Sequence, residues 1–102
     1  MADVIWAETA LDELDAVADY IALDNPNAAK TLVQTVFSKT RLLADFPEMG
    51  STPNELVGLD YRQLIINPCR IFYRITSDSR QVYIVHILRQ ERDMLRFFQS
   101  VQ

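Results

Sequence analysis

The sequence predicts an α+β fold in the order β-α-α-β-β-β, in which a helical hairpin covers one face of a sheet. Two amphipathic helical stretches are separated by a turn signal, and three strand-like runs with compact links follow them. A short apolar run precedes the first helix. Because 102 residues are enough for one modest core, we expect residues 1–102 to form a single domain.

The N-terminal part is predicted to form one strand and two helices. Residues 3–7, DVIWA, are short and apolar with a β-branched pair, which favours a strand. In residues 8–23, apolar side chains recur at helical spacing and acidic residues lie mostly opposite them. Asn25 can cap a second helix whose first turn holds Pro26, and the apolar stripe continues to residue 44. Two helices joined by so short a turn form a hairpin.

The C-terminal half is predicted to form an antiparallel meander of three strands. Residues 50–58 hold both glycines of the chain and indicate a loop. Strand-like runs follow at residues 59–66, 69–76 and 81–88, joined by an Asn-Pro link and by the turn sequence SDSR. Residues 89–99 are expected to end the fold as a short helix.

The strand CRIFYRI, residues 69–75, has two chemically different faces because side chains alternate along a strand. One face is apolar: Cys69, Ile71, Tyr73 and Ile75. The other face carries arginines around one aromatic residue: Arg70, Phe72 and Arg74. Such strands are typical of a sheet that is covered on one side only. We therefore expect an open sheet face on which Arg62 of the preceding strand joins this cationic cluster.

Charge is unevenly distributed along a chain whose formal net charge is −4. Residues 1–29 hold seven acidic residues and no Lys or Arg, whereas residues 62–102 hold seven arginines and three acidic residues. This asymmetry predicts one cationic surface on an acidic body. The overall acidity argues against direct binding of free nucleic acid through its phosphates. Arginine suits planar, two-point contacts with carboxylates or phosphates.

No sequence feature requires a cofactor, a metal or a membrane. Cys69 is the only cysteine, which excludes an internal disulfide and a cysteine-clustered metal site. No apolar run approaches the roughly 20 residues that span a bilayer. The N-terminus is acidic and has no secretory signal pattern. We therefore expect a cytoplasmic protein without a cofactor.

Several stretches occur in an order and spacing that resemble a known family. They are Trp6 with Leu14 and YIA (20–22), NPNAA (25–29), LLADFPEMGS (42–51), YR (61–62), RIFYRI (70–75) and VYIVHILRQERD (82–93). Each is degenerate by itself. Together they cover nearly the whole chain and resemble the ParE branch of the RelE/ParE toxin superfamily of bacterial toxin–antitoxin modules.

The resemblance implies a small toxin with a RelE/ParE-like fold. A cognate, ParD-like antitoxin would hold it inactive by wrapping it with a C-terminal segment. ParE-like members trap DNA gyrase with cleaved DNA, whereas RelE-like members enter the ribosome and cleave mRNA. A homodimer and larger toxin–antitoxin assemblies both stay open. The fold does not choose between the two targets, because function depends on the site.

Cleavage of RNA through its own 2′-OH needs a base, an acid and cations that stabilise charge on the phosphate. Three arginines could supply the cations: Arg62, Arg70 and Arg74. Three side chains remain as acid–base candidates: His86, Tyr73 and Tyr83. Tyr73 is assigned to the core, and the C-terminal aromatic residues Phe97 and Phe98 have no proton to give. His86 lies in an apolar run and is more simply a packed, hydrogen-bonded residue, so the acid–base set is incomplete.

These observations favour a gyrase inhibitor over an enzyme, with no catalytic residues. The expected target-binding residues are Arg62, Arg70, Phe72, Arg74, Arg89 and Arg92. The expected antitoxin-binding residues are Trp6, Arg89, Arg92 and Arg96. One alternative is a ribosome-dependent mRNA endoribonuclease that uses Arg62, Arg70, Arg74 and His86. Another is a toxin-like binding module without toxicity. Replacing Arg70 and Arg74 together by Glu is expected to abolish toxicity and leave the fold intact.

Overall fold

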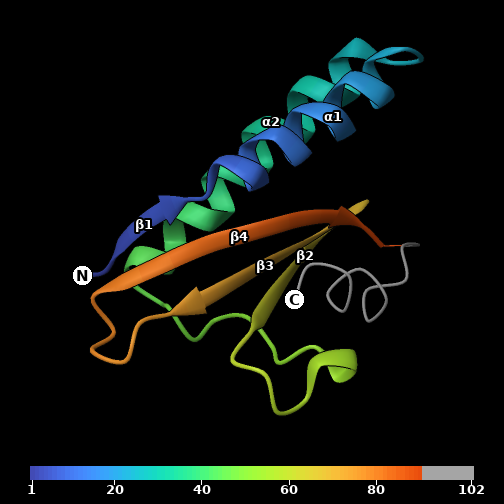
Figure 1. Cartoon of the computed structure of the whole chain (residues 1–102). Coiled ribbons are helices and arrows are strands. Elements are labelled where there is room, and N and C mark those ends of the chain that lie inside the picture. Colours follow the sequence, from blue (N-terminus) through green and yellow to red (C-terminus); the bar gives the residue numbers. More distant parts are fainter. Residues whose placement is uncertain (91–102) are drawn as a thin grey trace.

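The computed structural model describes residues 1–90, and its elements follow the predicted order. They are β1 (Asp3–Trp6), α1 (Glu8–Ala22), α2 (Pro26–Arg41), the short 3₁₀ helices η1 (Leu42–Ala44) and η2 (Asn54–Leu56), β2 (Arg62–Ile66), β3 (Cys69–Ile75) and β4 (Gln81–Arg89). The α1–α2 hairpin lies on one side of the sheet, and the segment that carries η2 lies on the other (Figure 1). Of the helix predicted at 89–99, Arg89 belongs to β4, and residues 91–99 lie outside the described residues.

The four strands form one mixed sheet in the order β1-β4-β3-β2. The last three strands pair antiparallel with their neighbours along the chain. β1 instead runs parallel to β4, from the pair Asp3–Gln81 to the pair Trp6–Ile84. Parallel strands need a long connection between them, and here that connection includes both helices. The sequence pattern did not predict this parallel pairing.

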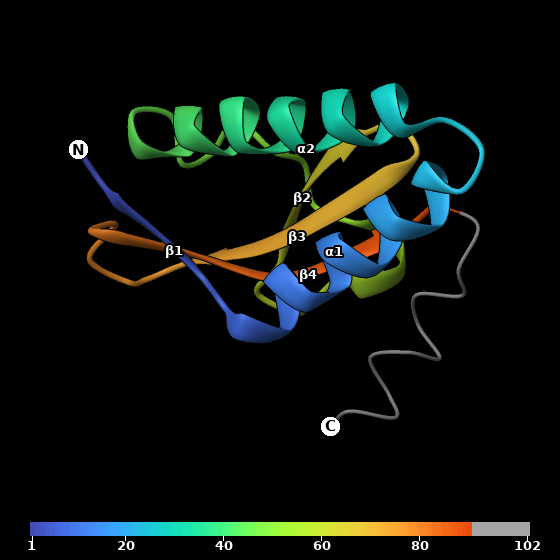
Figure 2. The same cartoon turned by 90° about the horizontal axis from the view of Figure 1, so that it is seen from above.

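The helices begin where the sequence predicts. The Asn25 side chain accepts a hydrogen bond of 3.0 Å from the backbone N–H of Ala28, and Pro26 occupies the first turn of α2. α1 and α2 run side by side over the sheet (Figure 2). Apolar side chains from both helices and from one sheet face form the main core, including Leu14, Val36, Ile71, Tyr73 and Ile84. Within residues 1–90, no helix combines the length and apolar character needed to cross a membrane.

A second, smaller apolar cluster lies on the other side of the sheet. Leu56 of η2 packs there with Phe72 of β3 and Leu88 of β4, and all three are buried. The sheet face that was predicted to be open is therefore partly covered by the loop that precedes β2.

The chain between η1 and η2 is fixed to the sheet by hydrogen bonds. The buried hydroxyl of Tyr73 donates to the carbonyl of Pro47 and accepts from the N–H of Gly50, both at 2.8 Å. A Cβ at Gly50 would lie 2.5 Å from the carbonyl oxygen of Gln63, so only glycine fits here without a backbone shift. These contacts hold residues 47–50 against β2 and β3.

Candidate functional site on the sheet

The residues expected to share one open sheet face are divided between its two faces. Arg62 lies opposite Tyr73, whose side chain is in the main core, so Arg62 belongs to the helix side of the sheet. Its guanidinium donates to the carbonyls of Gly50 at 2.8 Å and Glu48 at 3.2 Å. The predicted placement of Arg62 beside Arg70 is therefore wrong. Arg62 instead ties a loop to the end of the sheet.

Arg70 lies on the predicted face but is only 8% exposed. Its guanidinium makes a two-point contact with the carboxylate of Glu55, at 2.5 and 2.9 Å, and also donates to the side-chain oxygen of Gln63. The hydrogen bonds from Arg70 lower the pKa of Glu55 from 4.5 to about 2. The expectation of an exposed Arg70 is wrong because the loop that carries Glu55 covers and neutralises it.

Phe72 is also covered. It is fully buried against Leu56, and the Arg70 guanidinium carbon lies 5.0 Å from its ring centroid. Phe72 was expected to be an exposed target contact. Its ring instead packs against the guanidinium of Arg70 and against Leu56 of η2.

Arg74 is the part of the predicted cluster that remains open. Its side chain is 52% exposed, and a carboxylate oxygen on the exposed side chain of Asp60 is 4.0 Å away. The guanidinium carbon lies 5.6 Å from the ring centroid of Tyr61, a distance at which a cation is attracted to an aromatic face. A weak, solvent-screened ion pair leaves the donors of Arg74 accessible.

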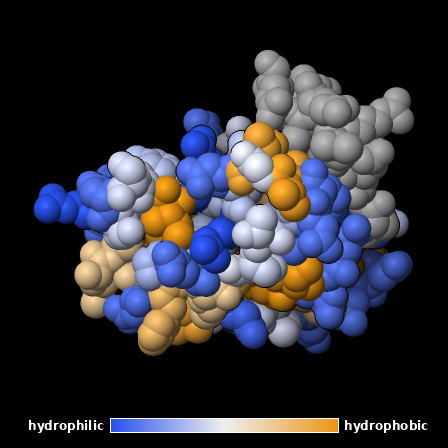
Figure 3. All heavy atoms as spheres, turned by 90° about the horizontal axis from the view of Figure 1, so that it is seen from below, coloured by the Kyte–Doolittle hydropathy of each residue, from blue (hydrophilic) through white to orange (hydrophobic). Residues whose placement is uncertain are grey.

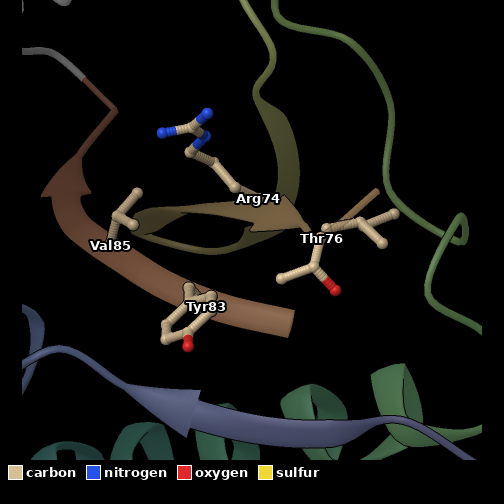
Figure 4. A pocket seen from close by; sticks show the side chains of 5 residues that line it. Arg74, Thr76, Tyr83 and Val85 are labelled. Carbon is tan, nitrogen blue, oxygen red and sulfur yellow. The ribbon is translucent and has the colours of Figure 1, made fainter. Parts of the chain in front are cut away.

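Arg74 borders a pocket of about 320 Å³, here called the Arg74 pocket, whose lining residues are Arg74, Ile75, Thr76, Tyr83 and Val85. The side chains come from neighbouring positions at one end of β3 and β4 (Figure 4). The Tyr83 hydroxyl donates to the side-chain oxygen of Gln81 at 3.0 Å. Seen from the side opposite the helices, hydrophobic residues form separate small groups between hydrophilic ones (Figure 3). The pocket thus combines one accessible cation with apolar walls, which suits a carboxylate or phosphate carried on an apolar partner.

The acid–base candidates do not line the Arg74 pocket, apart from Tyr83. His86 is packed and hydrogen-bonded, as predicted: its Nδ1 lies 3.1 Å from a carboxylate oxygen of Glu13 on α1. Tyr73 is in the core, also as predicted, and burial raises the pKa of its hydroxyl. Neither residue lines the Arg74 pocket.

The remaining predicted residues lie elsewhere. The Arg89 guanidinium carbon is 4.8 Å from the ring centroid of Tyr20 on α1. Trp6 is partly buried and packs on Phe37, with ring centroids 4.9 Å apart. Arg92 and Arg96 lie outside the described residues. In residues 1–90, no group of three or more His, Cys, Asp or Glu side chains is arranged to hold a metal ion.

The partners of these residues that were not predicted from the sequence include Glu13, Glu55, Tyr61 and Gln63. Glu13 was assigned to the solvated acidic face of the first helix, and Glu55 belongs to a segment without periodicity. Gln63 directly precedes apolar residues of β2, and its alternation with Leu64 was the one signal that could have placed it on the Arg70 face.

Comparison with known proteins agrees with this architecture. Residues 4–94 match the family described as the ParE toxin of the type II toxin–antitoxin system parDE. Toxin RelE2 of Caulobacter vibrioides is 32% identical over 89 residues, which cover 87% of this chain and 92% of that toxin.

Solved structures show the same fold. The chromosomal ParDE TA system from P. aeruginosa contains a chain that aligns with a TM-score of 0.71 and 25% identity, covering 89% of this chain and 98% of its own. The RelBE2 toxin–antitoxin complex from Mycobacterium tuberculosis contains one that aligns with a TM-score of 0.58 and 18% identity, covering 87% of this chain and 98% of its own. With the family match extending over most of the sequence, the chain belongs to the ParE toxin family of type II toxin–antitoxin systems.

Proposed function

We propose that this toxin inhibits DNA gyrase, and that it does so as a binding protein rather than as a nuclease. The observation that carries the proposal is the burial and ion pairing of Arg70 on the sheet. Arg70 is neutralised by Glu55 and buried, so the sheet does not offer the clustered cations that stabilise charge on a cleaved phosphate. Of the three acid–base candidates, only Tyr83 lines the Arg74 pocket, so the pocket does not bring an acid and a base together from among them. Gyrase inhibition by ParE-like relatives needs no such acid–base set.

The proposed direct contacts with gyrase are Arg74, through its pocket, and Arg89 and Arg92 of the C-terminal part. Arg62, Arg70 and Phe72 contribute indirectly. Arg62 fixes residues 48–50 through hydrogen bonds to their backbone carbonyls. Arg70 and Phe72 hold η2 against the sheet. In this arrangement Arg62, Arg70 and Phe72 shape the surface. Arg74, Arg89 and Arg92 touch the target.

The proposed regulator is a ParD-like antitoxin. The similar solved structures include a ParDE TA system and a RelBE2 toxin–antitoxin complex. Trp6, Arg89, Arg92 and Arg96 are the proposed antitoxin contacts. An antitoxin segment that folds on binding would cover a large surface at the cost of ordering its own chain. We infer a cytoplasmic location from the location of gyrase.

The test is a supercoiling assay with purified full-length toxin, gyrase, ATP and relaxed plasmid, scored for lost supercoiling and for trapped cleaved DNA. Wild-type toxin is expected to inhibit, and antitoxin to reverse the inhibition. Arg74→Glu is expected to raise the inhibitory concentration at least tenfold. Lys30→Glu, which makes the same charge change on the exposed surface of α2, is the matched control and is expected to inhibit like the wild type.

A folded toxin that binds antitoxin but leaves supercoiling unchanged would contradict the proposal. In that case, cleavage of mRNA on translating ribosomes separates the two alternatives. Cleavage would support the endoribonuclease, and its absence would support a binding module without toxicity.

A further inference from the structure

A short loop presents large apolar side chains to solvent next to the Arg74 pocket. This loop, residues 45–49, is here called the Phe46 loop. Phe46 is 61% exposed and Met49 is 44% exposed. Together with Asp45, Pro47, Glu48 and Ser79 they line a second pocket, of about 570 Å³.

Hydrogen bonds fix the backbone of the Phe46 loop to η1 and to the strands β2 and β3. The N–H of Phe46 donates to the carbonyl of Leu42 at 2.9 Å, and the Pro47 carbonyl accepts from the buried hydroxyl of Tyr73. The Glu48 carbonyl accepts from Arg62. A loop fixed in this way loses little conformational entropy on binding, which favours its use as a docking point.

The charges around the exposed apolar residues select the kind of partner. Asp45 and Glu48 lie in the same loop, and both are exposed. An apolar surface flanked by carboxylates is complementary to a hydrophobic side chain that has Arg or Lys beside it. Exposed aromatic residues and Met on a fixed backbone are also residue types that recur at the centre of protein interfaces.

The second pocket adjoins the first through the turn between β3 and β4. Ser79 lines the pocket of the Phe46 loop, Thr76 lines the Arg74 pocket, and the N–H of Ser79 donates to the carbonyl of Thr76 at 2.9 Å. The two docking points therefore have opposite charge and lie on either side of one turn. Opposite charges at neighbouring points fix the orientation in which a partner can bind.

We propose that the Phe46 loop is a second docking point for the target of the toxin, and that it accepts a target segment in which a hydrophobic side chain adjoins Arg or Lys. The inference rests on the proposed function, because it extends the contact made through the Arg74 pocket. The acidic and cationic points would bind two segments of opposite charge on the same target.

The test compares variants of the full-length toxin in the gyrase supercoiling assay. The double variant Phe46→Ser, Met49→Ser is expected to raise the inhibitory concentration at least tenfold, because the apolar contact is lost. Asp45→Lys, Glu48→Lys is expected to weaken inhibition as well, because the loop would then repel a basic segment. The matched control is Leu23→Ser, Val57→Ser, which removes strongly exposed apolar side chains elsewhere and is expected to inhibit like the wild type.

Thermal unfolding and antitoxin binding accompany each variant, so that a folding defect is recognised. Wild-type inhibition by the Phe46→Ser, Met49→Ser variant would overturn the proposal, and so would an equal loss in the control. If wild-type toxin arrests growth without inhibiting gyrase, gyrase inhibition is ruled out as its function, but the docking point is still tested. The same variants are then scored by growth arrest, where selective loss in the loop variants supports the docking point and retained arrest overturns it.

Discussion

At the scale of single residues, Arg70 and Arg74 show how position decides the role of a side chain. Both point to the same face of β3. Arg70 is covered by η2 and forms an ion pair with Glu55. Arg74 is not covered by η2, and its side chain is half-exposed. Removing one partner of a partly buried ion pair leaves a charge without its hydrogen bonds, but changing an exposed arginine costs little.

We therefore expect different results from the two Arg→Glu substitutions. Arg70→Glu places a second carboxylate beside Glu55, whose side chain is 36% exposed, and is expected to lower the free energy of unfolding by about 1.5–3 kcal/mol. Arg74→Glu is expected to change it by less than about 0.5 kcal/mol. Urea denaturation followed by circular dichroism measures both. The structure thus opposes the expectation that the double substitution leaves the fold intact, and equal stability of the two single variants would contradict this account.

The pKa of Glu55 predicts how this pair depends on pH. Because its pKa falls from 4.5 to about 2 on folding, the folded chain binds fewer protons than the unfolded chain between these values. The stabilisation is complete above about pH 5, since Glu55 is then ionised in both states, and it is lost as the pH falls toward 2. The stability difference between wild type and Glu55→Gln should shrink over this range.

Denaturant unfolding at a series of pH values measures that difference. Arg70→Met provides the control for the cause, because it keeps the carboxyl and removes the guanidinium. It should show the same loss of acid sensitivity as Glu55→Gln. An unchanged acid sensitivity in Arg70→Met would mean that another group depresses the pKa of Glu55.

At the scale of elements, β4 is paired with β1 along its first half and is contacted by α1 along its second half. β1 pairs only with residues 81–84, and beyond them Glu13 of α1 accepts a hydrogen bond of 3.2 Å from the N–H of Ile87. The same carboxylate oxygen contacts the ring of His86. An acidic residue of the helix thus satisfies a backbone donor that a longer β1 would have paired.

Glu13→Ala is expected to loosen the second half of β4. Loss of the carboxylate should lower the free energy of unfolding by about 1 kcal/mol. It should also speed amide exchange at Ile87 more than at residues 82–84, which β1 protects. Asp12→Ala, at the neighbouring exposed position, is the control and should change stability by less than about 0.5 kcal/mol. Hydrogen exchange measured by NMR distinguishes local loosening from a uniform loss of stability.

At the same scale, local sequence patterns predict some features of the fold and miss others. Local signals placed the helices, the Asn25 cap and the burial of Tyr73 correctly. Arg62 shares the core side with Leu64 and Ile66, because residues two apart share a face. Residues 64–66 are all apolar, so alternation in the sequence did not reveal this. The contact between Glu55 and Arg70 could not have been read from alternation either, since it joins a loop without periodicity to a strand fifteen residues away.

Strict alternation also fails in β4. The pairing shifts by one residue between Phe72 and Tyr73, whose partners are His86 and Ile84. Val85 is therefore the extra residue of a bulge, and Ile87 takes the core position that alternation assigns to His86. A bulge depends on the partner strand, so the sequence of β4 alone does not reveal it.

At the scale of the whole molecule, α1 presents acidic side chains to solvent, whereas the sheet face away from the helices carries the half-exposed Arg74. Exposed acidic residues recur along α1: Glu8, Asp12, Asp15 and Asp19. The Arg74 pocket lies on the face of the sheet that the helices do not cover. A net charge of −4 therefore coexists with a local cationic contact. Such a molecule is suited to a protein target with matching charges and poorly suited to gripping a nucleic-acid backbone along its length.

This charge distribution predicts a weak dependence of target binding on salt. A protein that contacts six to ten phosphates loses about 10³- to 10⁵-fold in affinity between 50 and 200 mM salt, because counterions are released on binding. If the toxin meets gyrase through a few charged and apolar contacts, its affinity should fall by less than about tenfold over the same range. Biolayer interferometry with immobilised gyrase measures this, and Arg74→Glu should flatten the dependence further. A hundredfold or larger loss would contradict this account, because it would show that many charged contacts, rather than a few, dominate binding to gyrase.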